Sequence, residues 1–443
     1  MATWLDRTQT AGNQRTFTFS AWIKRAGNYA QYNHLFTTTP NPGSWDSIRF
    51  ENNDTLAVRL NNEGASIITS KKFRDPNAWY HIVIAVDTTQ ATDSNRVKIY
   101  VNGEQETNLG TASYPSQNQD LNFNKNGETL RIGHNTWSTG GNEFFYGLMS
   151  HVHLCDGTAY AASDFGSTDS TTGEWKINTS PSVTYGTNGF FIMKDGNSVT
   201  DQSGEGNNFS VANGTLTKTE DNPSNIFATL NVISVNSANG NFNNANTNFS
   251  TGASAWRTAF STFGRSTGKF YCEMKWTSGS NMMFGVFSLD EKNKFSDIGY
   301  VGDGTLGNRA VGLAQGGDYY INGNNSTYTG GSNTSWSSGD IIQIALDKDN
   351  NKVYFGKNGT WMGSGDPTSG STGTGAISFS TESHEHWGFA VSAYASTADV
   401  NFGNGYFGTS AVSSAGTNAS NNGIFEYDVP AGYTALSTKG LNL

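Results

Sequence analysis

Acidic residues at alternate strand positions are the first pattern to test, because a retaining glycosidase holds two carboxylates ~5 Å apart across the scissile bond. In a β-sandwich enzyme this would be written Glu-x-Asp-x-Glu or Glu-x-Asp-x-x-Glu. Neither spacing occurs, and the nearest acidic groupings, ENND at 51–54 and TESHEH at 381–386, lack it. The sequence therefore disfavours polysaccharide hydrolysis, which remains the least favoured of the possible functions.

Aromatic residues beside polar loops indicate a different chemistry, since sugar-binding proteins stack pyranose rings on Trp or Tyr and bond the hydroxyls with Asn, Asp and backbone groups. The residues in this setting are Trp45, Trp137, Tyr319, Tyr320 and Trp361. Other tryptophans lie inside strand patterns and are expected in the core or at strand edges, namely Trp22, Trp79, Trp276, Trp336 and Trp387. For the loop set, ordinary packing or contact with a neighbouring protein is an equally open interpretation.

The stretch HVHLC alternates metal-ligating and apolar residues, which puts three ligand types on one strand face: His151, His153 and Cys155. Val152 and Leu154 would fill the core side of the same strand. We therefore favour packed side chains over a zinc site. SHEHW, with His384 and His386, repeats the form in an expected loop and carries the same interpretation.

The stretch KDGNSVTDQSGEGNN carries oxygen ligands of the kind that calcium prefers, at Asp195, Asp201, Asn207 and Asn208. It also fits a turn in which glycines take left-handed angles, so calcium and a structural turn both stay open. No other cofactor is expected, because no Ser-His-Asp, Cys-His or Walker arrangement stands out. GDGTLG at 302–307 lacks the strand-then-helix setting that phosphate binding needs.

Charge is sparse and net negative, with 14% charged residues and a formal net charge of −10. Without a basic patch to attract phosphates, nucleic acid is not an expected partner. No apolar segment reaches the ~18 residues of a membrane span, so membrane insertion is not expected. The start, MATWLDRTQTAGNQ, lacks the basic stretch and apolar run of a signal peptide. Two cysteines are too few for a disulfide framework, so core burial must stabilise the fold.

Period-two alternation recurs along the chain without a sustained helical period, which predicts an all-β protein. In FTFSAWIKR, one strand face holds Phe17, Phe19, Ala21 and Ile23. In WYHIVIAVD, residues 79–87, both faces are largely apolar, which predicts a central strand. In KFYCEMKW, residues 269–276, Cys272 shares a face with apolar neighbours, so we expect it to be a buried small hydrophobe.

One sequence pattern occurs twice, as VDTTQATDSNRVKIYVNGEQ at 86–105 and LDKDNNKVYFGKNGTW at 346–361. Each is a strand end with Asp, a polar loop, a short apolar strand and Asn-Gly, which can take the positive φ angles of a tight hairpin. A chain of 443 residues is too long for a single hydrophobic core, since domains usually have ~150 residues. Because residues 215–231 are polar and contain a proline, we expect the boundary there. The prediction is two β-sandwiches, residues 1–221, with a linking segment from about 156, and 222–443.

Several of these stretches carry a family resemblance. FTFSAWIKR, AWYHIVIAVDTT, VKIYVNG, LRIGHN and FYGLMSHVHLCDGTAY occur in the order of a laminin-G-like, concanavalin A-like jelly-roll domain. GKFYCEMKW, MMFGVFS, WSSGDIIQIALDKDNNKVYFGKNGTW, HWGFAVSAY and YDVPAGYTAL resemble a SPRY domain, itself a concanavalin A-like sandwich. The join, from VHLCDGTAYAASDFGSTDSTTGEWK to DNPSNIFATLN, is similar to the linking region of tandem laminin-G/SPRY proteins of tailed bacteriophages, notably those of marine bacteria and cyanobacteria.

The resemblance implies two concanavalin A-like jelly-roll β-sandwiches in tandem and a non-enzymatic virion structural protein. Such a protein is made in the host cytoplasm and displayed on the head or tail, as a capsid decoration or a tail-associated adhesion protein. Its expected partners are capsid or tail proteins and, through the loop aromatics, host surface polysaccharide. The main alternative is a receptor-binding tail fibre or lectin with specific carbohydrate recognition. The sequence leaves the oligomeric state open.

Overall fold

The computed structural model describes residues 3–27, 31–41, 44–135, 143–233, 240–290, 298–327, 334–380 and 385–439, with 39–41 as backbone only. The all-β prediction is confirmed, since strands dominate and the helices are short 3-10 turns: η1 (Asp93–Asn95), η2 (Ala162–Asp164), η4 (Met362–Ser364) and η5 (Pro367–Thr372). None of the helices in these ranges is long and apolar enough to cross a membrane.

The chain divides into two compact units, Met1–Lys218 and Thr219–Leu443. The change of unit falls inside the polar stretch 215–231. Independent folding of domains 1–221 and 222–443 stays a prediction, and each unit is described below by itself.

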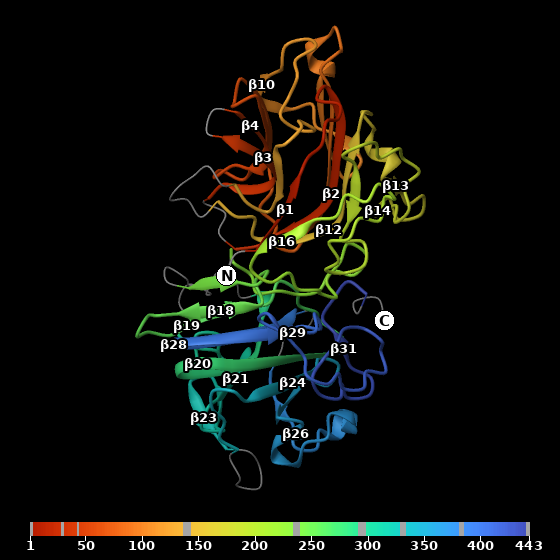
Figure 1. Cartoon of the computed structure of the whole chain (residues 1–443). Coiled ribbons are helices and arrows are strands. Elements are labelled where there is room, and N and C mark those ends of the chain that lie inside the picture. The colour runs from red at the N-terminus through yellow and green to blue at the C-terminus, as the bar shows by residue number, and fades with distance from the viewer. Residues whose placement is uncertain are drawn as a thin grey trace. The chain divides into compact units, whose positions relative to one another are not determined.

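The first unit consists of two antiparallel sheets and a hairpin (Figure 1). The eight-stranded sheet has the order β10 (Leu109–Ser113), β6 (Ala65–Lys72), β5 (Thr55–Leu60), β4 (Ser44–Phe50), β3 (Asn33–Asn41), β11 (Thr129–Ile132), β1 (Trp4–Thr8), β16 (Ser210–Asn213). The six-stranded sheet has the order β15 (Phe190–Ile192), β12 (Gly147–Asp156), β2 (Thr16–Arg25), β7 (Trp79–Asp87), β8 (Val97–Val101), β9 (Glu104–Gln105). The hairpin pairs β13 (Gly166–Thr168) with β14 (Trp175–Ile177).

One hydrophobic core fills the space between these two sheets. The predicted face of β2 lies in it, with Phe17, Phe19, Ala21 and Ile23 all fully buried. Strand β7 is central, between β2 and β8, and its Ile82, Ile84 and Val86 belong to the same core. Because successive side chains of a strand alternate in direction, the pattern of period two was sufficient to predict this layer.

A further layer covers the outer face of the six-stranded sheet. Val83 and Cys155 from the sheet form a small buried cluster with Ala162 and Phe165 from the chain that follows β12. Trp175 of the hairpin packs against this cluster. The segment after β12 therefore seals one sheet face, which is why both faces of β7 are apolar.

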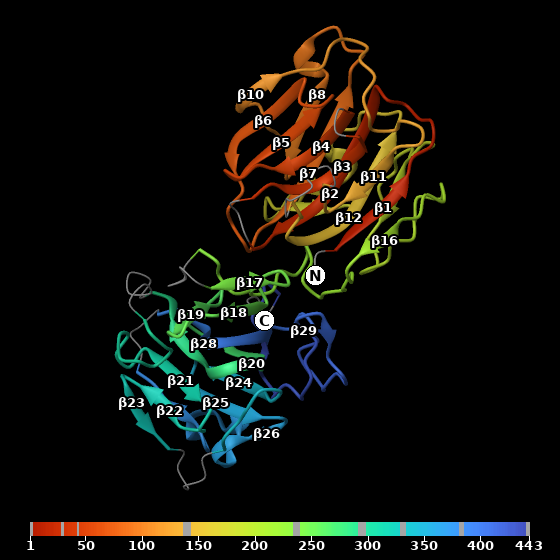
Figure 2. The ribbon, with the colours of Figure 1, turned by 60° about the vertical axis from the view of Figure 1, so that its left-hand side comes forward.

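The second unit is one extensively branched sheet that folds over itself (Figure 2). Its first strands are β17 (Asn241–Asn243), β18 (Asn248–Thr251), β19 (Arg257–Phe260), β20 (Lys269–Ser288), β21 (Ala310–Ala314), β22 (Tyr319–Ile321) and β23 (Asn324–Ser326). These are followed by β24 (Ile341–Asp347), β25 (Lys352–Lys357), β26 (Thr360–Trp361), β27 (Ile377–Ser378), β28 (Trp387–Asn401) and β31 (Thr434–Ala435). A separate pair is β29 (Tyr406–Phe407) with β30 (Ser410–Ala411).

Strands β20 and β28 pair along most of their length and bend together. At the bend, Gly279 has φ +112°, and a Cβ there would lie 2.3 Å from the Ala395 carbonyl oxygen, so only glycine fits. The first half of β20 pairs with β24 and the second half with β21. Phe270 of the first half and Phe284 of the second half lie in the same core, so the halves face each other as two layers.

The interior of the second unit agrees with the predicted strand faces. Cys272 is fully buried in the core beside Phe270, Met274 and Trp276, as expected for a small hydrophobe. A second cluster, with Tyr271, Ala345 and Tyr354, lies on the outer face of this layer and is covered by the chain around Phe425 and Tyr433. Burial raises the pKa of the Cys272 thiol well above its ordinary value.

Candidate binding face

The outer face of the eight-stranded sheet carries an unbroken row of polar side chains. Directly paired residues of antiparallel strands point to the same side of a sheet. Pairing therefore aligns, from β1 to β10, the residues Asp6, Arg131, Thr37, Ser47, Arg59, Ser66 and Ser113. A neighbouring row contains His34, Arg49, Ala57, Ile68 and Thr111. We call these two rows, with the side chains that contact them, the polar face.

Two arginines and two glutamates form an ion-pair network on the polar face. Glu51 Oε1 lies 3.1 Å from Arg49 Nε and 3.0 Å from Arg59. Glu63 Oε1 lies 3.0 Å from Arg49, and its Oε2 lies 3.6 Å from Arg59. Arg59 also donates to Ser66 Oγ at 3.0 Å. Because each guanidinium has several fixed donors, this network presents donors and acceptors at defined positions on rigid strands.

Aromatic rings flank this network. The guanidinium of Arg49 lies 4.6 Å from the ring centre of Tyr32 and 5.7 Å from that of Trp45. The sequence placed Trp45 in a loop, whereas the structure places it on β4, on the same side as Ser47 and Arg49, with 3% of its surface exposed. In this structure the ring of Trp45 contacts the guanidinium of Arg49. The assignment of Trp45 as a glycan contact stays a prediction.

At the other end of the polar face, Arg131 forms a bidentate ion pair with Asp6. Its Nε lies 2.5 Å from Asp6 Oδ1, and its Nη2 lies 2.5 Å from Asp6 Oδ2. The rings of His134, Trp4 and Phe144 form one cluster, with the centre of His134 4.5 Å from Trp4 and 4.4 Å from Phe144, and Trp4 5.9 Å from Phe144. Burial, assisted by the positive charge of Arg131, lowers the pKa of His134 to about 4. The stacked imidazole is therefore neutral near pH 7.

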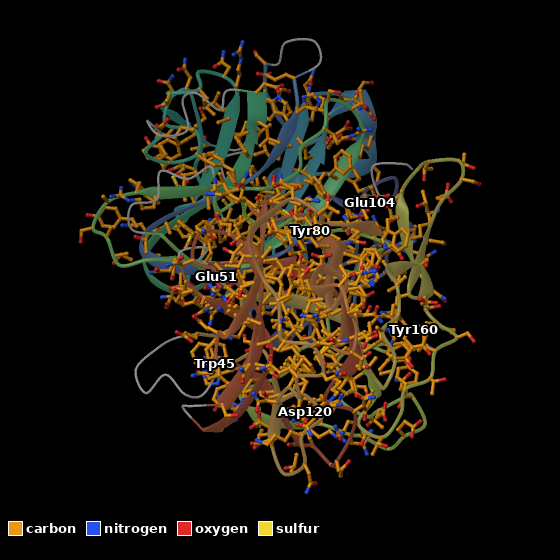
Figure 3. All side chains as sticks on the ribbon, turned by 90° about the horizontal axis from the view of Figure 1, so that it is seen from above. Trp45, Glu51, Tyr80, Glu104, Asp120 and Tyr160 are labelled. Atoms are coloured by element: carbon orange, nitrogen blue, oxygen red, sulfur yellow. The ribbon has the colours of Figure 1, made fainter. Side chains whose placement is uncertain are left out.

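The middle of the polar face is closed over by neighbouring chain. His34 is fully buried, with Nδ1 2.8 Å from Ser47 Oγ and Nε2 3.2 Å from a Glu143 carboxylate oxygen. Burial lowers the pKa of His34, while the bond from His34 lowers the pKa of Glu143. Access from solvent is greatest toward β5, β6 and β10, where Glu63 and Ser113 are exposed. In Figure 3, Trp45 and Glu51 lie on one side of this unit and Tyr160 of the covering layer on the other.

The carboxylates of the polar face are unsuited to glycoside hydrolysis. A glycosidase needs one protonated carboxyl as general acid and one free carboxylate, each directed at the bond to be cut. Glu51 and Glu63 instead share the same two arginines, and Asp54, the other end of ENND, pairs with Arg25 and Arg74. These carboxylates therefore do not form an acid and base pair for cleavage.

The structure describes three of the remaining four sugar-binding candidates. Trp137 lies outside the described residues. Tyr319 and Tyr320 are neighbours on β22 and therefore point to opposite sides: Tyr319 packs against the main core and Tyr320 against the cluster that includes Phe287. Trp361 lies on β26 and packs over the cluster of the C-terminal cover. All four assignments stay predictions.

The calcium candidates are held by protein groups. Asp201 accepts hydrogen bonds from the backbone N–H groups of Phe191, Ser203 and Asn207, at 2.8 to 2.9 Å. Asp195 accepts from Gln202 at 2.9 Å. Gly204 and Gly206 have the positive φ angles that the turn interpretation requires.

A protein cation already stands at this turn. Arg7 donates to the side-chain oxygen of Asn207, and the carboxylates of Asp201 and Asp156 attract its guanidinium. In this structure Arg7 supplies the positive charge that a calcium ion would bring. Calcium binding stays a prediction. The hydrogen bonds and glycine angles given above are those of a structural turn and need no bound ion.

The zinc pattern resolves into a packed aromatic layer. His153 is buried, with its ring 4.0 Å from that of Phe191 and its Nδ1 3.0 Å from the hydroxyl of Tyr185. Cys155 is buried beneath the cover, which raises its pKa to about 12. His386 instead lies 3.3 Å from Asp290, and His384 lies outside the described residues. In the described part of the chain, no three His, Cys, Asp or Glu side chains are grouped to hold a metal ion.

Sequence reasoning missed the polar face, although one signal was present. In SWDSIRFE, the alternate residues Trp45, Ser47, Arg49 and Glu51 place one aromatic and three polar side chains on one side of a strand. The partners Arg59, Glu63 and His34 come from other strands and turns. Their approach depends on the register of the strands, which the sequence does not display.

Comparison with known families supports the sandwich fold. Residues 4–164 match a family model described as the concanavalin A-like lectin/glucanases superfamily, Laminin_G_3. No curated protein matches the chain.

Three solved structures illustrate the structural likeness. The SPRY domain of human HERC1 is similar at 16% identity and a TM-score of 0.26, covering 35% of this chain and 87% of its own. A heptameric SAP-like pentraxin from Limulus polyphemus is similar at 19% identity and a TM-score of 0.27, covering 36% and 72%. The TRIM65 PSpry domain is similar at 11% identity and a TM-score of 0.27, covering 39% and 91%.

The predicted fold class, concanavalin A-like jelly-roll sandwiches, is therefore confirmed.

Proposed function

We propose that the protein is a non-enzymatic, surface-displayed virion protein of a tailed bacteriophage that adheres to host polysaccharide and is held on the particle by neighbouring capsid or tail proteins. The observation that carries the adhesive role is the polar face, where Arg49 of β4 and Arg59 of β5 share ion pairs with Glu51 and Glu63, and where Arg59 and Glu63 lie at the accessible end. Fixed donors and acceptors on a sheet are suited to binding hydroxyl-rich ligands.

The fold and the composition support the same role. A concanavalin A-like fold of this kind is consistent with binding or adhesion. A net charge of −10 disfavours nucleic acid as the ligand. The placement on a virion rests on the resemblance of the join between the two halves to tandem laminin-G/SPRY phage proteins.

The adhesive role is tested by binding of fluorescently labelled full-length protein to host cells and to their extracted polysaccharide. We expect saturable binding that Arg59→Ala and Glu63→Ala weaken, because both residues lie at the accessible end of the polar face. Lys71→Ala is the matched control, since Lys71 pairs with Glu106 at 2.7 Å and lies outside the polar rows. Wild-type protein that binds neither cells nor polysaccharide would refute the adhesive role.

The virion placement has its own test. Electron microscopy of intact particles with an antibody to this protein should label the head or tail surface. Labelling at the distal tip of the tail would favour the receptor-binding alternative over decoration. Release of reducing ends from host polysaccharide by the purified protein would overturn the non-enzymatic assignment.

A further inference from the structure

Four half-buried aromatic rings form a continuous row on the second unit. Trp256 directly precedes β19, Tyr300 lies in the chain before β21, Tyr320 lies on β22 and Tyr394 lies on β28. The ring centres of Trp256 are 5.8 Å from Tyr394 and 5.6 Å from Tyr300. Tyr300 is in turn 5.7 Å from Tyr320. We call these four residues the aromatic row.

The aromatic row packs on one side against the interior of the second unit, and its rings are half-exposed to solvent. Trp256, Tyr300 and Tyr320 pack against a buried cluster that includes Met283, Phe287 and Val301. The planes of successive rings in the row are inclined by 56°, 65° and 82°. No pair is stacked face to face, and each ring is only half-buried, so part of each ring remains accessible to solvent.

Amide side chains lie at both ends of the row. Asn325 pairs directly with Tyr320 across β22 and β23, so the exposed amide lies on the same side as the ring. Asn281 pairs directly with Tyr394 across β20 and β28. An aromatic surface with amides beside it combines the two contacts that a pyranose needs, a flat apolar face and hydroxyl partners.

The surroundings favour a neutral sugar over other occupants. Tyr and Trp are also common at protein interfaces. In the described ranges, however, the exposed large hydrophobic residues are Val211 and Ile233, neither of which belongs to the row, so the row is not extended into the larger exposed apolar patch typical of such an interface. Asp303 lies beside Tyr300 in the sequence, and the whole chain carries a net charge of −10, which disfavours an acidic polymer.

We infer that the aromatic row is a binding site for neutral polysaccharide, with pyranose rings packed against the exposed parts of Trp256 and Tyr320. The inference rests on the proposed adhesive role and gives it a second, independent site in the other unit. It also explains why Tyr320, and not Tyr319, is suited to a glycan contact.

The test is affinity electrophoresis of the full-length protein in native gels that contain laminarin, dextran or agarose, with alginate as the acidic comparison. Retardation is expected in at least one neutral gel and not in alginate. Trp256→Ala and Tyr320→Ala are each expected to raise Kd about tenfold, since each removes one stacking surface. Tyr320→Phe keeps the ring and is expected to retain binding.

Matched variants keep the inference falsifiable. Tyr406→Ala removes a half-buried aromatic outside the row, on β29, and is expected to bind as wild type. Near-ultraviolet circular dichroism checks that each variant is folded. No retardation of the wild type in any neutral gel, or unchanged binding by both Trp256→Ala and Tyr320→Ala, overturns the inference. The proposed function survives either result if Arg59→Ala still weakens binding to host cells.

Discussion

The same Asn-Gly hairpin closes a strand pair in each unit, β8–β9 in the first and β25–β26 in the second. Asn102 and Gly103 have φ angles of 49° and 87°, and Asn358 and Gly359 have 47° and 87°. Asn102 also accepts from the N–H of His81 at 2.7 Å, as Asn358 does from Ile341 at 2.9 Å. One local sequence pattern therefore gives one local structure in two different sheets.

The two hairpins differ in what covers them. Trp175 from the β13–β14 hairpin lies against Gly103, where a Cβ would be 2.5 Å from the indole. Tyr427 lies against Gly359, where the corresponding distance is 3.0 Å.

The covers also differ in how they are fixed. In the first unit the indole N–H of Trp175 donates to Nδ1 of His81 at 3.0 Å, which leaves His81 Nε2 to donate to Ser20. In the second unit the buried carboxylate of Glu273 accepts from the backbone N–H groups of Glu426 and Tyr427, at 2.8 and 2.9 Å. A neutral imidazole and a buried carboxyl thus do the same structural work, and they respond to substitution and to pH in different ways.

Removing the anchor of the second cover should have the largest effect. Glu273→Ala leaves two backbone N–H groups and the Tyr271 hydroxyl without their acceptor and opens a cavity, so we expect a loss of about 4 kcal/mol in the free energy of unfolding. Urea unfolding measures the loss. Glu273→Gln keeps the shape and one acceptor and should cost less than half as much. Equal losses for the two variants would show that the acceptor is not what anchors the cover.

The two turn glycines give the next largest effect and a direct comparison. Gly103→Ala adds a left-handed strain of about 1–2 kcal/mol and also displaces Trp175, so we expect a total loss of about 3 kcal/mol. Gly359→Ala meets the same φ but a more distant neighbour in Tyr427, and should cost about 2 kcal/mol. Thermal unfolding of both variants tests the order, and a larger loss for Gly359→Ala would contradict it.

How much of this was visible in the sequence depends on how far apart the contacting residues are. The Asn-Gly turns and the alternating faces of β2 and β7 need only neighbours in sequence, and they were predicted. Trp175 and His81 are 94 residues apart in the sequence, and no local pattern indicates that they are in contact. Trp45 was misplaced in a loop because PGSWDS has turn residues before it, whereas pairing with β3, of Ser44 with Asn41 and of Asp46 with Thr38, extends the strand through it. The polar face, likewise, exists only once the register is set.

The pH dependence of the two units should have opposite signs. Burial lowers the pKa of His81 to about 3, below its ordinary 6.5, so the unfolded chain binds this proton first and the first unit loses stability as pH falls below 6.5. Burial raises the pKa of Glu273 to about 7, above its ordinary 4.5, so the second unit loses stability as pH rises from 4.5 toward 7.

Hydrogen exchange resolved by mass spectrometry tests this contrast within one sample. On going from pH 7 to pH 5, we expect His81 to contribute a loss of about 2 kcal/mol to the first unit and Glu273 a gain of about 2 kcal/mol to the second. The pKa values of four other histidines of the first unit, His34, His134, His151 and His153, are also lowered, so the first unit as a whole should lose more. Protection factors corrected for the intrinsic exchange rate measure both. His81→Gln should reduce the loss in the first unit by about 2 kcal/mol and leave the second unchanged, whereas Glu273→Gln should remove the gain in the second unit alone. A parallel response in both units would contradict the assignment of the two anchors.

The smallest expected effect compares how the two covers are attached. The first cover is held through the side chain of Trp175, and the second through the backbone N–H of Tyr427. Trp175→Phe keeps the ring against Gly103 but removes the N–H that His81 accepts, so we expect a loss of about 1 kcal/mol. Tyr427→Phe is the matched change in the second unit, and it keeps the backbone N–H that Glu273 accepts. It should therefore cost at most a few tenths of a kcal/mol. If the two phenylalanine variants lose the same stability in urea unfolding, the hydrogen bond from Trp175 to His81 does not stabilise the first cover. Packing alone would then hold the first cover, and only the second would have a polar anchor, Glu273.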